Sequence, residues 1–244
     1  ELIFQEDAPA NLEQCIRSAL FFRSEFDAHA IDIECKINVD LPSGGTVTRK
    51  VSRLWLLIEI EARSRAVMGF ALRDNLDVAL WMAKAMEPWR PRELTIPDLA
   101  YAPGAGMPRS TYSQELVARS RSTALDNALA HYAHALETGF CRARGGVMIF
   151  GKSHTPRSRP VVEQLFSRLA RGALRKLPGG FEPATRLGEH KLMISNYSPD
   201  EYPMQLHLLE ELLDVIIANY NATPHPALGN LSPLAFLKSK TPTP

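Results

Sequence analysis

The sequence predicts an α/β fold in which a mixed sheet is covered by helices. Residues 23–33 and two β-rich runs at residues 54–60 and 66–72 indicate three early strands. The first two are separated by a long hairpin loop that contains the turn sequence Pro42-Ser43-Gly44-Gly45. Farther along the chain, apolar residues recur at helical spacing instead. Three strands followed by alternating helices and strands, with a helical tail, are typical of an α/β domain.

Helix and loop signals predict the secondary structure in the middle of the chain. Asn75 caps a predicted helix that ends before Pro88. The Pro- and Gly-rich residues 88–108 come next, and so long an irregular stretch predicts either a lid or a substrate-contacting loop. We then expect a strand over residues 116–125, a helix over residues 127–137 and a short strand at the apolar run VMIF of residues 147–150.

Three helices are predicted in the last third of the chain. After Pro160, apolar residues at i, i+3, i+4 spacing indicate a helix whose first turn contains Glu163. The spaced residues are Val162, Leu165, Phe166, Leu169 and Ala173. An amphipathic pattern predicts a second helix over residues 201–220, and Ser232-Pro233 has the capping chemistry of a short last one.

Composition excludes several classes of protein. The chain has 244 residues, of which 45% are hydrophobic and 23% charged, so it is long and apolar enough to bury a core. Disordered and fibrous proteins are therefore excluded. Lys and Arg number 28 against 27 Asp and Glu, which gives a net charge of only +1. Any polyanion must consequently be bound by a local patch rather than by the whole surface.

The three cysteines have neither disulfide-framework nor zinc-ligand spacing, which fits a reducing, cytoplasmic compartment. No apolar run approaches the roughly 20 residues of a membrane helix, and no signal peptide is present, so we expect no membrane partner. The chain opens at Glu1 without a methionine and closes in TPTP. We therefore expect it to be part of a longer protein whose flanking domains are missing.

Three acids stand out by their position. Asp27 lies in the first predicted strand, Asp126 follows a later strand, and Glu163 begins a helix. Hard divalent cations prefer such oxygen ligands, and two Mg²⁺ ions about 3.5–4 Å apart can activate an attacking hydroxyl and stabilise the leaving oxygen of a phosphodiester. Asp32, on the polar side of the first strand, is the main alternative to Asp27 as first ligand.

The three acids resemble the DDE triad of retroviral-integrase-like transposases, and the 36 residues between Asp126 and Glu163 have the family's spacing. Four segments agree with this resemblance. IEIEARSRAVMGFAL resembles the strand pair after the first acid, LDNALAH the segment around the second, and PVVEQLFSRL the helix that bears the glutamate. YNATPHPALGNLSPLAFL resembles the closing element of the family, through Tyr220, Asn221, His225, Leu228, Ser232 and Pro233.

The resemblance covers roughly residues 26–237 and is closest to bacterial Mu-type, TnsB-like and TniA-like transposase subunits. It implies an RNase H-like fold, a five-stranded mixed sheet flanked by helices, with the first acid on the central strand. In this interpretation residues 1–22 are an N-terminal lead-in segment, residues 23–197 form the catalytic core and residues 198–244 are its C-terminal helical extension. The sequence departs from the family in two respects: Glu59 and Glu61 replace the usual Asp of the second strand, and Gln164 replaces an Arg that often follows the glutamate.

The resemblance also implies an activity. It predicts a DNA transposase core in which Asp27, Asp126 and Glu163 are the catalytic residues and bind two Mg²⁺ ions, which Mn²⁺ can replace. Water attacks at a transposon end, and the freed 3′-hydroxyl then attacks target DNA. The implied partners are double-stranded DNA, further copies of the chain assembled on it, and an ATPase or targeting subunit. The implied setting is the bacterial cytoplasm, at the nucleoid.

Charge is unevenly distributed around Glu163. Residues 142–176 contain nine Lys or Arg and a single acid, Glu163 itself. Such residues position a duplex through its phosphates without reading its sequence. We therefore predict DNA contacts by Lys152, Arg157, Arg159, Arg168, Arg171 and Arg175.

Two other functions are compatible with the same residues. One is a structure-selective nuclease with the same fold, which hydrolyses DNA but does not join it. The other is a catalytically inactive copy that has been retained as a module for binding DNA or a protein partner. Three intact acids favour an enzyme over the inactive module.

Overall fold

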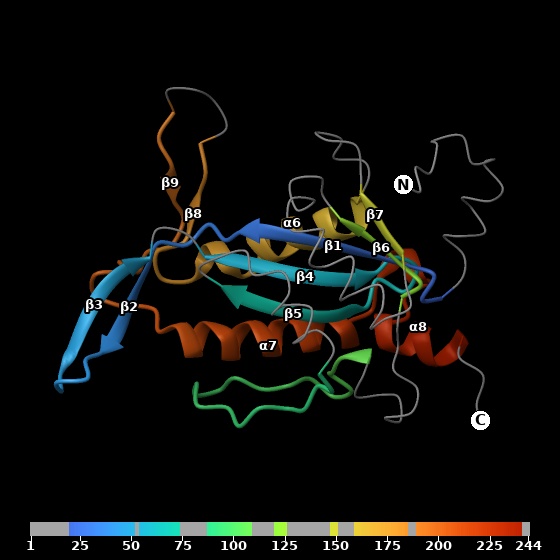
Figure 1. Ribbon diagram of the computed structural model, residues 1–244, viewed down its shortest axis with the longest axis horizontal. Helices are drawn as coiled ribbons and strands as arrows, with labels where there is room; N and C mark the ends of the chain where they lie inside the picture. The colour runs from blue at the N-terminus through green and yellow to red at the C-terminus, as the bar shows by residue number, and fades with distance from the viewer. Residues whose placement is uncertain are drawn as a thin grey trace.

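The computed structural model describes residues 20–51, 54–73, 87–108, 120–125, 147–150, 159–184 and 189–240. Its centre is a five-stranded mixed sheet with the strand order β5-β4-β1-β6-β7 (Figure 1). The strands are β1 (Arg23–Ala30), β4 (Trp55–Glu61), β5 (Val67–Arg73), β6 (Ser122–Leu125) and β7 (Val147–Phe150).

The directions of the strands define the fold class. β4 is antiparallel to both β1 and β5, whereas β6 is parallel to β1 and β7 is parallel to β6. Three antiparallel strands continued by two parallel ones, with helices packed on the sheet, form an RNase H-like arrangement. The predicted fold class is therefore confirmed, and β1 is the central strand.

The loop predicted between the first two strands of the sheet is itself a hairpin. β2 (Cys35–Asp40) and β3 (Thr46–Val51) pair antiparallel and extend beyond the end of the sheet (Figure 1). Their turn contains Gly44 and Gly45 at φ values of 85° and 89°, which glycine adopts without steric cost. The expectation of one long loop was therefore wrong, because the chain on both sides of this turn forms a ladder.

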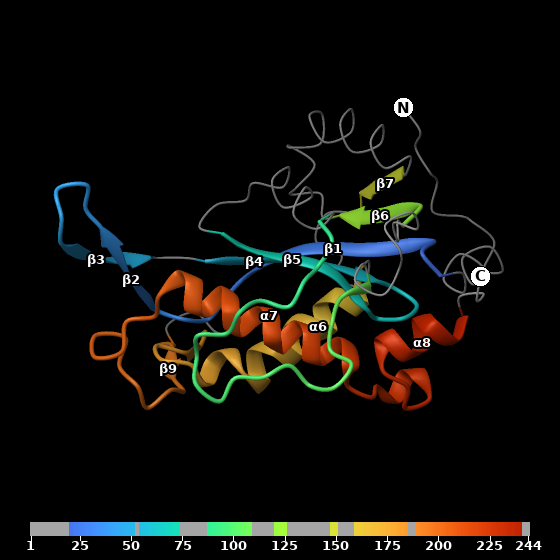
Figure 2. The same ribbon diagram turned by 90° about the horizontal axis from the view of Figure 1, so that it is seen from below.

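Two helices cover one face of the sheet. α6 (Pro160–Gly172) and α7 (Leu206–Ala222) lie side by side below it (Figure 2), followed by the short helix η5 (Pro226–Leu228) and by α8 (Pro233–Lys240). The predicted helix after Pro160 is confirmed, whereas the one expected from residue 201 begins at Leu206. The described chain also contains η4 (Leu174–Lys176) and the two-stranded pair β8 (Phe181–Glu182) and β9 (Leu192–Met193).

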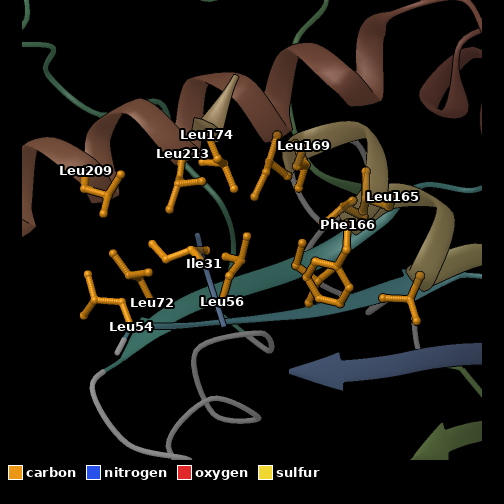
Figure 3. Packing of buried hydrophobic residues seen from close by; sticks show 14 of the residues in the cluster. Ile31, Leu54, Leu56, Leu72, Leu165, Phe166, Leu169, Leu174, Leu209 and Leu213 are labelled. Carbon is orange, nitrogen blue, oxygen red and sulfur yellow. The ribbon is translucent and has the colours of Figure 1, made fainter. Parts of the chain in front are cut away.

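The core lies between this face and the two helices. Alternate residues of β4, namely Leu56, Ile58 and Ile60, point toward the helices and are fully buried. They pack against one apolar side of α6 and one of α7, and Figure 3 shows the leucines of the three elements filling the space. The helix residues in this cluster are Val162, Leu165, Phe166, Leu169, Leu209, Leu213 and Ile217.

Residues 87–108, here called the strap, run along α7 (Figure 2). Polar side chains of α7 hold this irregular segment in place. Glu211 accepts hydrogen bonds from the backbone N–H groups of Thr95 and Ile96 at 2.7 and 2.8 Å, and the Nε1 of Trp89 donates to Asp214 at 3.1 Å. Side chains of α7 therefore satisfy backbone groups of the strap that no regular secondary structure pairs.

Several predictions lie outside the described residues. These are the helix after Asn75, the helix over residues 127–137, the first part of the strand predicted over residues 116–125, and the functional residues Asp126, Lys152 and Arg157. Within the described ranges, no helix has the length and apolar character needed to cross a membrane.

Asn221 provides a test of how the strap and α7 are joined to the sheet. Its buried side chain bonds both backbone groups of Val67 and donates to the carbonyl of Gly106 at 2.9 Å. We expect Asn221→Ala to lower the free energy of unfolding by about 3 kcal/mol, because buried backbone groups lose their partners. The more exposed Asn219→Ala, which loses bonds to Ala102 and Ala100, should cost less than about 1 kcal/mol. Equal losses in urea denaturation would contradict this account.

Candidate functional site

The site is built on one face of the central strand. Glu25, Asp27 and His29 alternate along β1, and their cross-strand partners in β4 belong to the core beneath α6. Successive inward-facing residues of a strand lie on the same side of the sheet, so all three side chains point toward α6. Each of them meets a different part of that helix or of the cavity beside it.

Glu25 caps the N-terminus of α6. Its Oε2 accepts hydrogen bonds from the backbone N–H groups of Val161 and Val162 at 2.8 and 3.0 Å. The helix has no capping side chain of its own, because Arg159 occupies the N-cap position without a capping bond. A carboxylate from the sheet thus satisfies N–H groups that a helix leaves unpaired at its start.

Burial sets the acidity of Glu25. The side chain is almost inaccessible, and this desolvation raises its pKa above the ordinary value. The hydrogen bonds from Val162 and Val161 and the charges of Arg23 and Arg159 act in the opposite direction. The raised pKa shows that loss of water outweighs these favourable contacts.

Asp27 lies two residues after Glu25 on the same face of β1 and is partly exposed to solvent. Its Oδ1 accepts a hydrogen bond from the backbone N–H of Ala28 at 2.9 Å, and its Oδ2 lies 3.4 Å from a guanidinium nitrogen of Arg159. The side chain of Asp27 is 18% exposed, whereas that of Arg159 is only 7% exposed. The structure therefore places Arg159, which the sequence predicts to contact DNA, inside the site as the counterion of Asp27.

Asp27 and Glu163 line one cavity of about 430 Å³ between β1 and α6. The sequence places these acids 136 positions apart, and the packing of α6 on β1 brings them to the same space. His29 also faces this cavity, and its ring stacks on Phe166 with the centroids 4.9 Å apart. Burial lowers the pKa of His29, against the opposing charges of Asp32 and Asp27.

Asp32 lines the same cavity but has a strong partner. The Nε and a terminal nitrogen of Arg175 lie 3.2 and 3.1 Å from its Oδ2. The other terminal nitrogen of Arg175 donates to Glu182 at 3.1 Å. Arg175, a further predicted DNA contact, is thus shared between two carboxylates, and Asp27 and Asp32 each have an arginine counterion in the cavity.

The remaining predicted DNA contacts in the described chain lie on α6. Arg168 and Arg171 are both exposed, and Arg171 bonds within the helix to the carbonyl and hydroxyl of Ser167 at 3.2 and 2.7 Å. Asp126 lies outside the described residues, directly after Leu125, the last residue of β6.

The donor set of the cavity suits a hard divalent cation. Asp27 and Glu163 bring carboxylate oxygens from two separate elements to one space, as Mg²⁺ and Mn²⁺ prefer. No group of three or more Asp, Glu, His or Cys side chains arranged to hold a metal occurs among the residues that the structure describes. The third predicted ligand, Asp126, is not among them.

Comparisons with known proteins do not add to this picture: the chain matches no family model, and no curated protein matches it.

Sequence reasoning missed two residues of the site, Glu25 and His29. A signal for both exists in the strand period, because they stand two residues before and two residues after Asp27 and so share its face. A second signal for Glu25 is the start of α6, where Arg159-Pro160 offers no capping side chain. Neither signal predicts which residues Glu25 and His29 contact, because β1 and α6 are distant in the sequence.

The cap can be tested by two substitutions of Glu25. We expect Glu25→Ala to lower the free energy of unfolding by about 2 kcal/mol, because two helix N–H groups lose their acceptor. Glu25→Gln retains an amide oxygen that can accept the same bonds, and should cost less. Urea denaturation at neutral pH measures both, and a Glu25→Ala variant as stable as the wild type would exclude the cap.

The raised pKa of Glu25 predicts a pH dependence. A carboxyl group whose pKa is raised by folding contributes its full stability below the unfolded value of about 4.5, and this contribution is lost as pH rises through the folded pKa. Gln does not titrate. The wild type should therefore lose stability relative to Glu25→Gln as pH rises from 4.5 toward neutrality. Glu61, whose pKa burial also raises, is present in both proteins and cancels. A pH-independent difference would contradict the assignment.

Proposed function

We propose that this chain is the catalytic core of a DDE DNA transposase, which cleaves DNA at transposon ends and transfers the 3′-hydroxyl strand into target DNA. One observation carries the proposal. Asp27 on the central strand and Glu163 in the first turn of α6 line the same cavity, although they are far apart in the sequence. The resemblance to the DDE family requires this pair to converge.

The position of β6 supports Asp126 as the third acid. β6 is the parallel neighbour of β1, with Ala124 in register with Glu25. Paired residues share a face of the sheet, so Ala124 lies on the side of Glu25 and Asp27. Side chains of a strand alternate between the two faces, and Asp126 is two positions after Ala124 in the sequence.

Asp27 and Glu163, together with Asp126, would hold Mg²⁺ or Mn²⁺. The bound metal supplies activation of the attacking hydroxyl and stabilisation of the leaving oxygen. The chain's own residues set the geometry for this chemistry. Glu25 fixes the start of the helix that carries Glu163, and Arg159 balances the charge of Asp27.

Double-stranded DNA is the proposed substrate, and several copies of the chain bind it in the bacterial cytoplasm. An ATPase or targeting subunit is the proposed protein partner. Arg168 and Arg171 are exposed on α6 and suit phosphate contacts, as do Lys152 and Arg157 of the sequence prediction. Arg175 differs from them, because a phosphate would have to compete with Asp32 and Glu182 for its guanidinium.

The reaction can be tested without knowing the transposon ends. A catalyst accelerates a reaction and its reverse. The reverse of strand transfer can therefore be measured in Mg²⁺ or Mn²⁺ on a branched DNA that imitates the joined product. We expect Asp27→Asn, Asp126→Asn and Glu163→Gln each to reduce release of the joined strand by about 10³-fold or more, with circular dichroism unchanged. Asp32→Asn is the matched control and should retain activity.

The outcomes separate the alternatives. Hydrolysis without strand joining or its reversal would indicate a nuclease, and DNA binding without either reaction would indicate an inactive module. An inactive Asp32→Asn variant beside an active Asp27→Asn variant would move the first ligand to Asp32.

A further inference from the structure

The turn between β4 and β5 lies close to α6 and α8 (Figure 1, Figure 2), and cationic residues occur on all three elements. Arg63 and Arg65 belong to the turn, Arg168 is exposed on α6, and Lys238 and Lys240 are exposed in the last turn of α8. We call these five residues the basic patch.

Ring contacts connect the turn to α8. The guanidinium of Arg63 lies 5.8 Å from the ring centroid of Phe236, and the Nζ of Lys240 lies 5.9 Å from the same centroid. A ring face attracts each cation, but the two cations repel one another. Phe236 thus gathers two like charges at one place on the surface.

Arg65 connects the turn to α6. Its guanidinium donates to the side-chain oxygen of Gln164, and its carbonyl accepts a hydrogen bond from the hydroxyl of Tyr220 at 3.1 Å. The pKa of His225 is lowered by burial first and then by the charges of Arg168 and Arg65, so both arginines lie near that ring. Gln164 directly follows Glu163, and the basic patch therefore begins beside the cavity.

The acids that the structure describes do not balance the charges of the basic patch. None of its five members forms an ion pair with a described residue, whereas Lys36, Lys50 and Lys191 elsewhere on the surface pair with Asp200 or Glu34. The acid of the turn, Glu61, is buried and accepts hydrogen bonds from Ser64 and from the N–H of Phe21. A cluster of like charges without counterions creates a positive potential that attracts a polyanion.

We propose that the basic patch binds the phosphate backbone of a DNA duplex and so holds the DNA that flanks the phosphodiester at the cavity. The assignment of DNA as the polyanion rests on the proposed function. Arg fits phosphate through its planar fork and Lys as a point charge, and neither reads the bases. The resulting contacts tolerate any sequence, as DNA outside a recognised end requires.

The test compares two variants that lose the same charge. The patch variant carries Arg63→Gln, Arg168→Gln and Lys240→Gln, and the control carries Lys36→Gln, Lys50→Gln and Lys191→Gln. Arg65 is left intact because its backbone adopts a φ of 57° and bonds Tyr220. Binding of a fluorescent duplex of mixed sequence is measured by anisotropy as a function of salt, with circular dichroism and thermal unfolding confirming that both variants fold.

We expect the patch variant to bind the duplex at least about tenfold more weakly at 0.1 M salt. The logarithm of the association constant should also depend less steeply on log[salt], with the magnitude of the slope smaller by roughly 0.9 for each phosphate that the variant no longer neutralises. The control should keep the wild-type affinity within about twofold, because its lysines are paired in the free protein. A patch variant with the affinity and slope of the control would overturn the proposal. So would a patch-dependent preference for duplex RNA over duplex DNA.

The proposed function and the basic patch can fail separately. If the wild type does not process the branched DNA but the patch variant still loses duplex binding, the transposase assignment fails and the patch remains. If the wild type is active and the patch variant binds like the control, the patch fails and the assignment remains.

Discussion

Glu25 in the central strand accepts hydrogen bonds from the first N–H groups of α6, and the rest of the site depends on this contact. Asp27 and His29, the next residues on the same face of β1, contact the helix at two further points. Asp27 forms an ion pair with the N-cap residue Arg159, and His29 stacks on Phe166. Contacts at three levels fix both the position of the helix along the strand and its rotation. Glu163 consequently faces the cavity that Asp27 lines.

The closing segment of the chain has a structural role that complements this constraint. Tyr220 and Asn221 at the end of α7 bond the backbone of Arg65, just before β5, and of Val67, its first residue. Ser232 accepts a hydrogen bond from Ala235 and so caps α8. These motif residues attach the C-terminal helices to the turn that carries part of the basic patch. The segment therefore stabilises the surface beside the cavity rather than lining the cavity itself.

Local patterns predicted the elements better than their contacts. The spacing of Val162, Leu165 and Leu169 predicted α6 because the core-facing side of a helix repeats every three to four residues. The start of α7 was placed five residues too early, because the prediction did not take account of Pro203, which disfavours a helical conformation at the residue before it. The pairing of Arg175 with Asp32 was not foreseen, because a charge count along the sequence ignores acids that are distant in the sequence. The Glu25 cap was missed for the same reason, as its register exists only in three dimensions.

The central claim is that Asp27 and Glu163 act as parts of one metal site, and Mn²⁺ binding followed by electron paramagnetic resonance tests it most directly. The titration compares the wild type with Asp27→Asn, Glu163→Gln and the double variant. If the carboxylates share an ion, each single substitution should weaken Mn²⁺ binding almost as much as both together, because residues that act as a unit are not additive. Additive effects, or wild-type affinity in either single variant, would contradict the account.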